Sequence, residues 1–256
     1  MTTEHIILAI FLFLIISILY SSVGQAGASG YLAVMVLLSF APETIKPTSL
    51  ILNIVVATIA SIKYLRADYF DRRLFIVLII TSLPMAFLGG YLPITPKFFK
   101  LLVGLFLIVA SFLLLAKEYF NKPEVPKSEL PTKQMTVTFG LITGSIIGLI
   151  SGLIGVGGGI FLSPILIMGK WTTVKKVSGI TALFILFNSI AGLSGHIAAL
   201  NKIDHNIIYW VIAVVIGGLT GSYLGTIKFN NRVLVTCLFF VLLTAGLKFV
   251  FIDFVK

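Results

Sequence analysis

The stretch that decides the fold is SGLIGVGGGIFLSPILIMGKW, residues 151–171. It places Gly155, three adjacent glycines at 157–159 and Pro164 inside one of the most apolar regions of the chain. Glycine and proline are the residues least compatible with the interior of a helix. The stretch therefore predicts a helix that breaks and restarts among apolar neighbours.

The composition around this stretch is that of a membrane protein. Of the 256 residues, 58% are hydrophobic and only 11% are charged, whereas a soluble domain carries roughly 25% charged residues. At ~20 residues per span, the chain is long enough for about ten membrane segments and leaves no room for a separate soluble domain. The net charge of +10 lies in short loops beside apolar runs, so it indicates orientation in a lipid bilayer and not binding to nucleic acid.

Apolar runs predict an all-α polytopic membrane protein. The expected segments lie at residues 5–23, 27–40, 45–64, 73–92, 97–117, 136–155, 158–169, 174–199, 206–227 and 232–252. The runs at 27–40 and 158–169 are too short to cross a hydrocarbon core of about 30 Å. Each is expected to be a half-helix, a tilted helix or one arm of a re-entrant hairpin.

The two sides of the polar stretch KEYFNKPEVPKSELPTKQ, residues 117–134, resemble each other. Matching positions occur in the same order: Thr48 with Thr181, Asp71 with Asp204, and GGYLP at 89–93 with GSYLG at 221–225. We predict an N-terminal membrane repeat at 1–117, a linker at 118–134 and a C-terminal membrane repeat at 135–256. Five segments per repeat give the second repeat the opposite topology, as in the inverted repeats of secondary transporters. Both aspartates fall at loop ends, where we expect helix N-caps.

Basic residues set the expected orientation. The loops around 63–73, 117–133, 170–176 and 228–232 hold most of the 19 lysine and arginine residues, and the face richer in basic residues is normally cytoplasmic. The sequence predicts a multi-pass protein of the cell membrane (the plasma or inner membrane), with both termini outside and the linker in the cytoplasm. It leaves open whether the protein forms a homo-oligomer.

Glycines occur in two different patterns. Gly140, Gly144, Gly148 and Gly152 recur every four residues and form one bare stripe on a helix, which predicts close packing against a neighbouring helix. The three adjacent glycines at 157–159 make no such stripe. They allow positive φ and an exposed backbone, which membrane proteins tolerate at hydrocarbon depth only where protein or a water-filled cavity covers it.

A helix that begins at Gly158 or Gly159 points free backbone N–H groups toward the break. These donors and the helix dipole form an anion site without a buried cation. The first repeat has a similar break in VGQAGASGY, residues 23–31, where Gln25 and Ser29 add side-chain donors. We expect the two broken helices to meet near the membrane midplane around one cavity. The alternative is a tight turn between packed helices that binds no ligand.

Other polar residues interrupt the apolar segments. Thr48 and Asn53 lie in the third segment, and Thr181 and Asn188 share one face of the eighth. Each either donates to an anion or joins neighbouring helices, and Ser163 either contacts an anion or bonds back to its own helix. The candidate substrate-binding residues are Gly24, Gln25, Gly27, Ser29, Thr48, Asn53, Gly157, Gly158, Gly159, Ser163, Thr181 and Asn188.

The sequence GLIGVGGGIFLSPILI at 152–167, followed by VSGITALFILFNSIAG at 177–192, resembles the sulfite exporter TauE/SafE family of membrane permeases. The GxGGG-x4-P element is the most specific part, and through both halves the resemblance extends over nearly the whole chain. It implies transport of sulfite, organosulfonates or related organic anions. The corresponding GQAGASGYLAV at 24–34 lacks the triple glycine and the proline, so Gln25 and Ser29 are expected to impose a substrate preference of their own.

We expect a carrier that exports such an anion by uniport, with alternating access through rocking of the two halves. No Asp or Glu falls in the middle of an apolar segment, so the carboxylate relay common in proton-coupled carriers is missing. The alternatives are an anion channel and a non-transporting packing or assembly protein.

An enzyme is not expected, because no His/Cys/Asp cluster or Ser–His pairing has a useful spacing. Neither a catalytic residue nor a metal ion nor a cofactor is predicted. Lys46 and His196 are interfacial residues or, alternatively, an anion contact at the outer mouth and a proton-coupling group.

Overall fold

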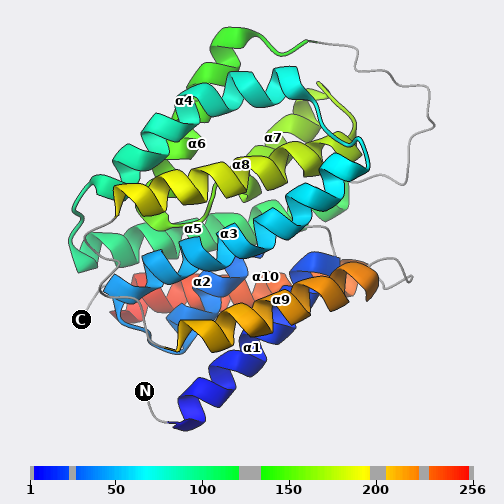
Figure 1. The fold of residues 1–256 in the computed structure, drawn as a ribbon. Coiled ribbons are helices and arrows are strands. Elements are labelled where there is room, and N and C mark those ends of the chain that lie inside the picture. The colour runs from blue at the N-terminus through cyan, green and yellow to red at the C-terminus, as the bar shows by residue number, and fades with distance from the viewer. Residues whose placement is uncertain (1–2, 23–26, 121–133, 197–205, 225–230, 254–256) are drawn as a thin grey trace.

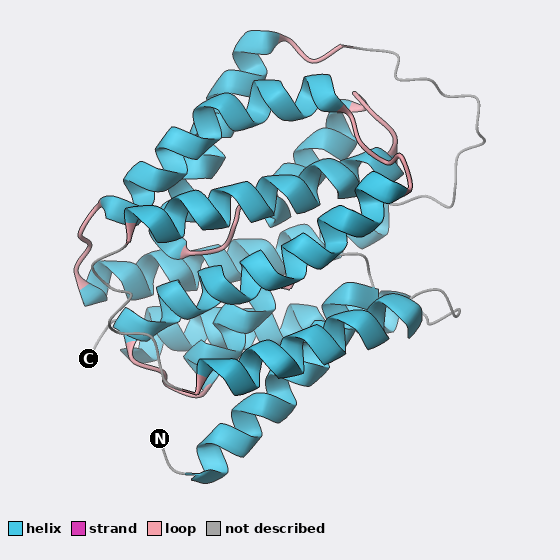
Figure 2. Ribbon diagram, viewed as in Figure 1, coloured by secondary structure: helices cyan, strands magenta, loops and turns pink. Residues whose placement is uncertain are grey.

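Every segment expected from the apolar runs contains a helix in the structure, a computed structural model that describes residues 3–22, 27–120, 134–196, 206–224 and 231–253 (Figure 1). The helices are α1 (Thr3–Ser22), α2 (Ala28–Leu37), α3 (Pro42–Arg66), α4 (Arg72–Tyr91), α5 (Pro96–Phe120), α6 (Val137–Ile154), α7 (Gly159–Gly169), α8 (Val174–Gly195), α9 (Ile207–Leu224) and α10 (Asn231–Leu247), and a π-helical segment, η2 (Lys248–Asp253), follows α10. No strand occurs in these ranges (Figure 2). The expectation of an all-α protein is therefore confirmed for the described part of the chain.

The described helices fall into long and short ones. Six are long and apolar enough to cross a membrane, namely α1, α3, α4, α5, α6 and α8. By contrast, α2 has 10 residues and α7 has 11. At 1.5 Å per residue, each of these reaches roughly 15 Å, or half of a hydrocarbon core. The prediction of two short helices is confirmed, and the chain is a polytopic membrane protein.

Local sequence explains several helix boundaries. The Asp71 carboxylate caps α4, because it accepts a hydrogen bond from the Leu74 N–H at 3.2 Å. This confirms its expected role, while Asp204 lies outside the described residues. Thr173 caps α8 in the same way through a backbone N–H of the first turn. Gly155 ends α6 with a φ of +89°, in the left-handed conformation that glycine adopts without strain.

The helices pack as pairs that join the two parts of the chain. Figure 1 shows α4 beside α6 and α1 beside α9, and α3 packs on α8 as α5 packs on α10. In every pair, one helix precedes the linker and the other follows it, so the two parts do not form separate bundles. The repeats 1–117 and 135–256 stay a prediction, and most of the linker 118–134 lies outside the described residues.

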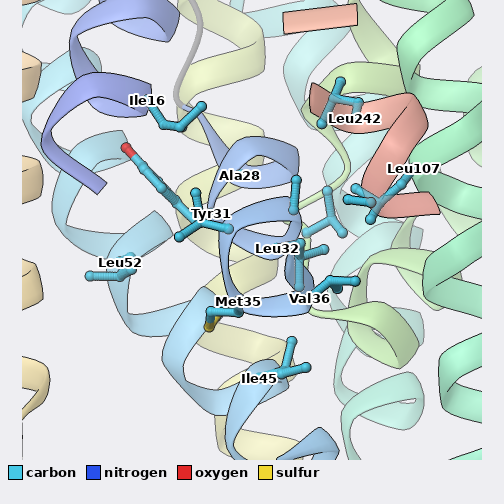
Figure 3. Packing of buried hydrophobic residues seen from close by; sticks show 14 of the residues in the cluster. Ile16, Ala28, Tyr31, Leu32, Met35, Val36, Ile45, Leu52, Leu107 and Leu242 are labelled. Carbon is cyan, nitrogen blue, oxygen red and sulfur yellow. The ribbon is translucent and has the colours of Figure 1, made fainter. Parts of the chain in front are cut away.

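The larger hydrophobic core surrounds α2. Every residue of this helix from Ala28 to Val36 is buried. Side chains of other helices enclose it, and Figure 3 shows among them Ile16 of α1, Leu52 of α3, Leu107 of α5 and Leu242 of α10. A helix that is apolar on all sides belongs in such an interior. The enclosure fixes the position of α2, and its N-terminal end is buried in protein.

The glycine stripe of α6 lies against the backbone of α4. A Cβ atom added at Gly144, Gly148 or Gly152 would overlap a carbonyl oxygen of α4, which at Gly148 is that of Ser82. The overlaps recur once per turn, so the two backbones are in contact over several turns. The prediction that this stripe serves close helix packing is confirmed.

Replacing Gly148 with Val is expected to lower the thermal stability of the detergent-purified protein. The added side chain would overlap the Ser82 carbonyl and push α4 away from α6, and overpacking of this kind costs about 1–3 kcal/mol. Gly218→Ala is the control, because a Cβ at that position meets only Ser17 and Ser21 at 3.6 Å. An unchanged melting temperature for Gly148→Val would contradict close backbone contact at this position.

Candidate functional site

Both short helices begin directly after a glycine in the left-handed conformation. Gly27 precedes α2 with a φ of +81°, and Gly158 precedes α7 with a φ of +79°. Gly155 and Gly157 also have positive φ, at +89° and +74°. Residues with a Cβ atom rarely adopt this conformation. The prediction that glycines supply an unusual backbone at the break is confirmed, and both short helices start in the same way.

These helix starts leave backbone N–H groups without a helical acceptor. The first four N–H groups of any α-helix lack an intrahelical partner, and Gly27 and Gly158 have no side chain with which to cap them. A helix N-terminus also carries a partial positive charge of about half a unit. Each start is therefore an electropositive cluster of donors, and both are buried in protein.

The N-termini of α2 and α7 meet at one cavity of about 100 Å³. The start of α2 contributes Gly27 and Ser29, and the start of α7 contributes Gly159 and Ser163. Roughly 10–15 Å³ is enough for one water molecule, so this cavity accommodates a small oxyanion with accompanying water. The fold thus brings together two breaks that lie in different halves of the sequence.

The long helices α3 and α8 also line the cavity, and four lining residues of each have the same spacing. The lining residues are Val56, Ile59, Ala60 and Lys63 on α3, and Ser178, Thr181, Ala182 and Ile185 on α8. This spacing keeps the four side chains of each set on one face of their helix. Over two turns, α3 therefore presents a mostly apolar face to the cavity, whereas the face of α8 carries two hydroxyl and two apolar side chains.

Two pairs of hydroxyl groups lie beside the helix starts. The Ser163 Oγ and Thr181 Oγ1 atoms are 3.2 Å apart, and the Tyr20 Oη and Ser29 Oγ atoms are 2.7 Å apart. All four residues line the cavity. Each pair has two hydroxyl protons and uses one for the mutual hydrogen bond. The mutual hydrogen bond of each pair leaves its second hydroxyl proton unused.

Lys63 and Tyr64 line the cavity close to the C-terminal end of α3. Lys63 is exposed to solvent and carries the only formal charge among the described lining residues. Neither residue is among the candidates from the sequence. Lys63 could have been identified from the sequence, because its helical spacing from Val56 and Ile59 places the three residues on one face. Nothing in the local sequence distinguishes the equally unexpected Tyr20.

The remaining candidates from the sequence lie elsewhere. Gly24 and Gln25 are outside the described residues, and Thr48, Asn53, Gly157, Gly158 and Asn188 do not line this cavity. The Asn53 side chain donates through Nδ2 to the Gly155 carbonyl oxygen at 3.3 Å, which joins α3 to the end of α6. The Asn188 side chain accepts through Oδ1 from the Ser82 hydroxyl at 2.8 Å, which joins α8 to α4.

The described lining combines apolar and polar groups. It consists of apolar residues, glycines, hydroxyl side chains and one lysine. Among the described residues, no three His, Cys, Asp or Glu side chains lie together in a way that could hold a metal ion. Helix starts, hydroxyls and a positive charge come together from five helices, α1, α2, α3, α7 and α8, and groups of these kinds can bind oxyanions.

Comparison with known proteins bears on the resemblance noted in the sequence. The family model described as Sulfite exporter TauE/SafE matches residues 9–249. A Sinorhizobium fredii protein named "Probable membrane transporter protein y4hK" is 35% identical over 256 residues, which cover 97% of this chain and 99% of that protein. The Bacillus subtilis "Probable membrane transporter protein YunE" is 25% identical over 211 residues, 76% of this chain and 75% of the relative. No solved structure matches the chain.

The match to the family model spans most of the sequence and includes both short helices. The similarity to y4hK extends along nearly the full length of both proteins. The family consists of transporters and is not an enzyme family. The expected relationship is confirmed, and the chain belongs to the sulfite exporter TauE/SafE family of membrane transporters.

Proposed function

We propose that this transporter exports a small sulfur-containing or organic anion, such as sulfite or an organosulfonate, and binds it between the N-termini of α2 and α7. The observation that carries the proposal is the one cavity lined by Gly27 and Ser29 from α2 and by Gly159 and Ser163 from α7. An anion there accepts hydrogen bonds from N–H and hydroxyl groups. It also lies at the positive ends of two helix dipoles.

The shape of a sulfonate or sulfite group suits this arrangement. Three oxygens on one sulfur accept hydrogen bonds from several directions, and the donors come from helix starts and hydroxyl pairs on different sides of the cavity. The walls formed by Val56, Ile59 and Ile185 are apolar and suit the short carbon chain of an organosulfonate. Both features support this substrate class.

The pairing of helices supports two inverted repeats. If α1 to α5 correspond in order to α6 to α10, the contact of α4 with α6 corresponds to that of α9 with α1. Likewise, α3 packs on its own counterpart α8, and α5 packs on α10. A pseudo-two-fold axis produces this pattern. Many secondary transporters combine such repeats with a site near the membrane midplane, where we place this cavity.

The orientation rule gives a direction of entry. Basic loops place the Lys63 end of α3 in the cytoplasm, so both termini lie outside and an anion enters past Lys63. A membrane potential that is negative inside favours anion export by roughly 2.3 kcal/mol per charge per 100 mV. Export by uniport therefore needs no coupling ion, and rocking of the repeats would open the site to the other side.

Anions of this class are expected to stabilise the detergent-purified protein against thermal unfolding. The panel is sulfite, sulfate, thiosulfate, taurine, isethionate and sulfoacetate, with chloride as the reference. A ligand at 100 times its Kd adds about 2.7 kcal/mol to the free energy of unfolding. Ser163→Ala and Thr181→Val are each expected to weaken binding about tenfold or more, because a hydrogen bond to a charged group contributes about 1.5–3 kcal/mol.

Ser145→Ala is the matched control for these variants. The Ser145 hydroxyl donates to the Leu141 carbonyl of its own helix, and the residue does not line the cavity. Equal losses of affinity in Ser145→Ala and Thr181→Val would place the anion elsewhere. A protein that no anion in the panel stabilises would contradict the proposal and leave the glycines as packing devices.

In liposomes, flux of the stabilising anion is expected to follow an imposed membrane potential and to saturate with concentration. Lys63→Gln should lower this flux more at low salt than at high salt, because an exposed charge at a mouth acts through attraction that salt screens. Lys170→Gln is the control, since Lys170 is also exposed but does not line the cavity. Strong dependence on a proton gradient at clamped potential would exclude uniport, and resolvable single openings would indicate a channel.

A further inference from the structure

Two buried hydroxyl groups have no role in the site described above. The Thr48 side chain on α3 and the Ser189 side chain on α8 are fully buried. Within the part of the chain that the structure describes, neither hydroxyl oxygen has a hydrogen-bond partner. An unsatisfied buried hydroxyl costs about 1–3 kcal/mol. Ser61 and Ser151 are also buried without a hydroxyl partner among the described residues, but Thr48 and Ser189 lie on the two helices, α3 and α8, that line the cavity.

The predicted internal repeat relates these residues to the cavity between the starts of α2 and α7. The matching positions are Thr48 with Thr181, Ser189 with Val56, and His196 with Lys63. The second member of each pair lines that cavity. The first member of each pair, Thr48, Ser189 or His196, therefore lies on the equivalent face of the opposite repeat from its partner. In an inverted repeat, corresponding faces lead to opposite sides of the membrane.

A second cavity, of about 360 Å³, lies toward the other end of α3. Its lining includes Lys46, Glu43, Gly195 and His196, together with the turn that follows α4. Lys46 stands in the first turns of α3 and Lys63 in the last, so the two cavities lie toward opposite ends of this helix.

The helices α4 and α8 are in close contact at a level between the two cavities. Along α8, Ile185 lines the first cavity and Gly195 lines the second, and Ser189 and Gly192 lie between them. A Cβ atom added at Gly90 of α4 would overlap the Gly192 carbonyl oxygen. The backbones of α4 and α8 therefore leave no space between them at this level.

Lys46 holds this closed region together. Its side chain is only 4% exposed, and its Nζ atom donates to the carbonyl oxygens of Gly89 and Gly90 at 3.2 and 3.1 Å. These carbonyls lie at the C-terminal end of α4, which attracts cations. The His196 Nδ1 atom lies 3.2 Å from the same Gly90 oxygen. The ammonium group therefore ties α3 to α4 at the point where α8 also contacts α4.

We propose that Thr48 and Ser189 line the second half of the anion path, and that Lys46 is the gate that closes it in this structure. The Lys46 ammonium donates to two neutral carbonyls, whereas an anion would add direct charge attraction to the hydrogen bond. An anion reaching this region thus competes with Gly89 and Gly90 for Lys46. Release of the carbonyls frees α4 from α3, and the second cavity becomes the exit. The inference rests on the anion transport proposed above.

A cysteine reporter at position 189 tests whether this face opens. Cys237, the only cysteine of the chain, is first replaced by Ser, and Ser189→Cys is then introduced as a nearly isosteric change. The probe is sulfonatoethyl methanethiosulfonate, a membrane-impermeant anion, applied to oriented liposomes from the Lys46 side. Labelling should be slow with Lys46 or Lys46→Arg. It should be about tenfold faster or more with Lys46→Met, which removes the charged hydrogen bonds.

Two controls separate gate opening from general loosening of the fold. Lys97→Gln removes an exposed charge at the same end of the molecule and should leave the labelling rate unchanged. Ser111→Cys lies on α5, where the Ser111 hydroxyl is buried and bonded within its own helix, and it should stay unlabelled in both backgrounds. Equal labelling of Ser189→Cys with Lys46 and with Lys46→Met would overturn the proposal, as would equal acceleration at position 111.

This experiment is independent of the substrate, because labelling requires no bound anion. If no anion stabilises the protein but Lys46→Met exposes position 189, the gate stands and the substrate class is wrong. If anions stabilise the protein through Ser163 and Thr181 but Lys46→Met leaves labelling unchanged, the site stands and the gate is wrong.

Discussion

Two helices start inside an apolar protein, and the N–H groups exposed at those starts constrain the rest of the structure. Neither lipid nor an aliphatic side chain accepts a hydrogen bond, so such groups need water, protein or a ligand as partner. Gly27 and Gly158 provide no capping side chain. Because α2 and α7 begin at the same cavity, their donors are concentrated at one place. An anion satisfies them better than water, since it also meets two helix dipoles.

Holding two helix starts at one cavity requires a rigid frame. The helix α2 is surrounded by side chains of α1, α3, α5 and α10 (Figure 3), and the backbones of α4 and α6 are in contact along a glycine stripe. Asn53 and Ser49 both donate to the Gly155 carbonyl, which fixes the end of α6 just before the break. Polar side chains near the break thus stabilise the frame, while Ser29 and Ser163 at the starts of α2 and α7 line the cavity.

The frame differs between the two ends of α3. Toward Lys63, a cavity lies between α3 and α8. Toward Lys46, Thr48 and Ser189 are buried and α8 is in glycine contact with α4. If the repeats are related by a pseudo-two-fold axis, exchanging these two arrangements gives the opposite-facing state without new folds or long displacements. The hydroxyls of Thr48 and Ser189, which have no partner in this state, then line a cavity in the opposite-facing state. The free-energy cost of leaving them unbonded is removed in that state.

Helix positions could be predicted from the sequence because an apolar run in a membrane has few alternatives to a helix. The break at residues 157–159 could also be predicted, since positive φ favours glycine. The partners of Asn53 and Asn188 could not, because the Gly155 carbonyl and the Ser82 hydroxyl come from other helices. A polar residue in an apolar segment does not show by itself whether it faces a ligand or a neighbour. For the same reason Lys63 resembles an ordinary loop lysine until the face of α3 is known.

The most direct test of the central claim is a crystal structure with a selenium analogue of a stabilising anion, such as selenite in place of sulfite. Selenium scatters anomalously, so the anion can be located independently of water. We expect one anomalous peak in the cavity, with anion oxygens about 2.7–3.2 Å from the N–H groups that start α2 and α7. The hydroxyl pair of Ser163 and Thr181 should lie at a similar distance. A peak only outside the cavity, or a cavity filled with water alone at saturating anion, would contradict binding between the two helix starts.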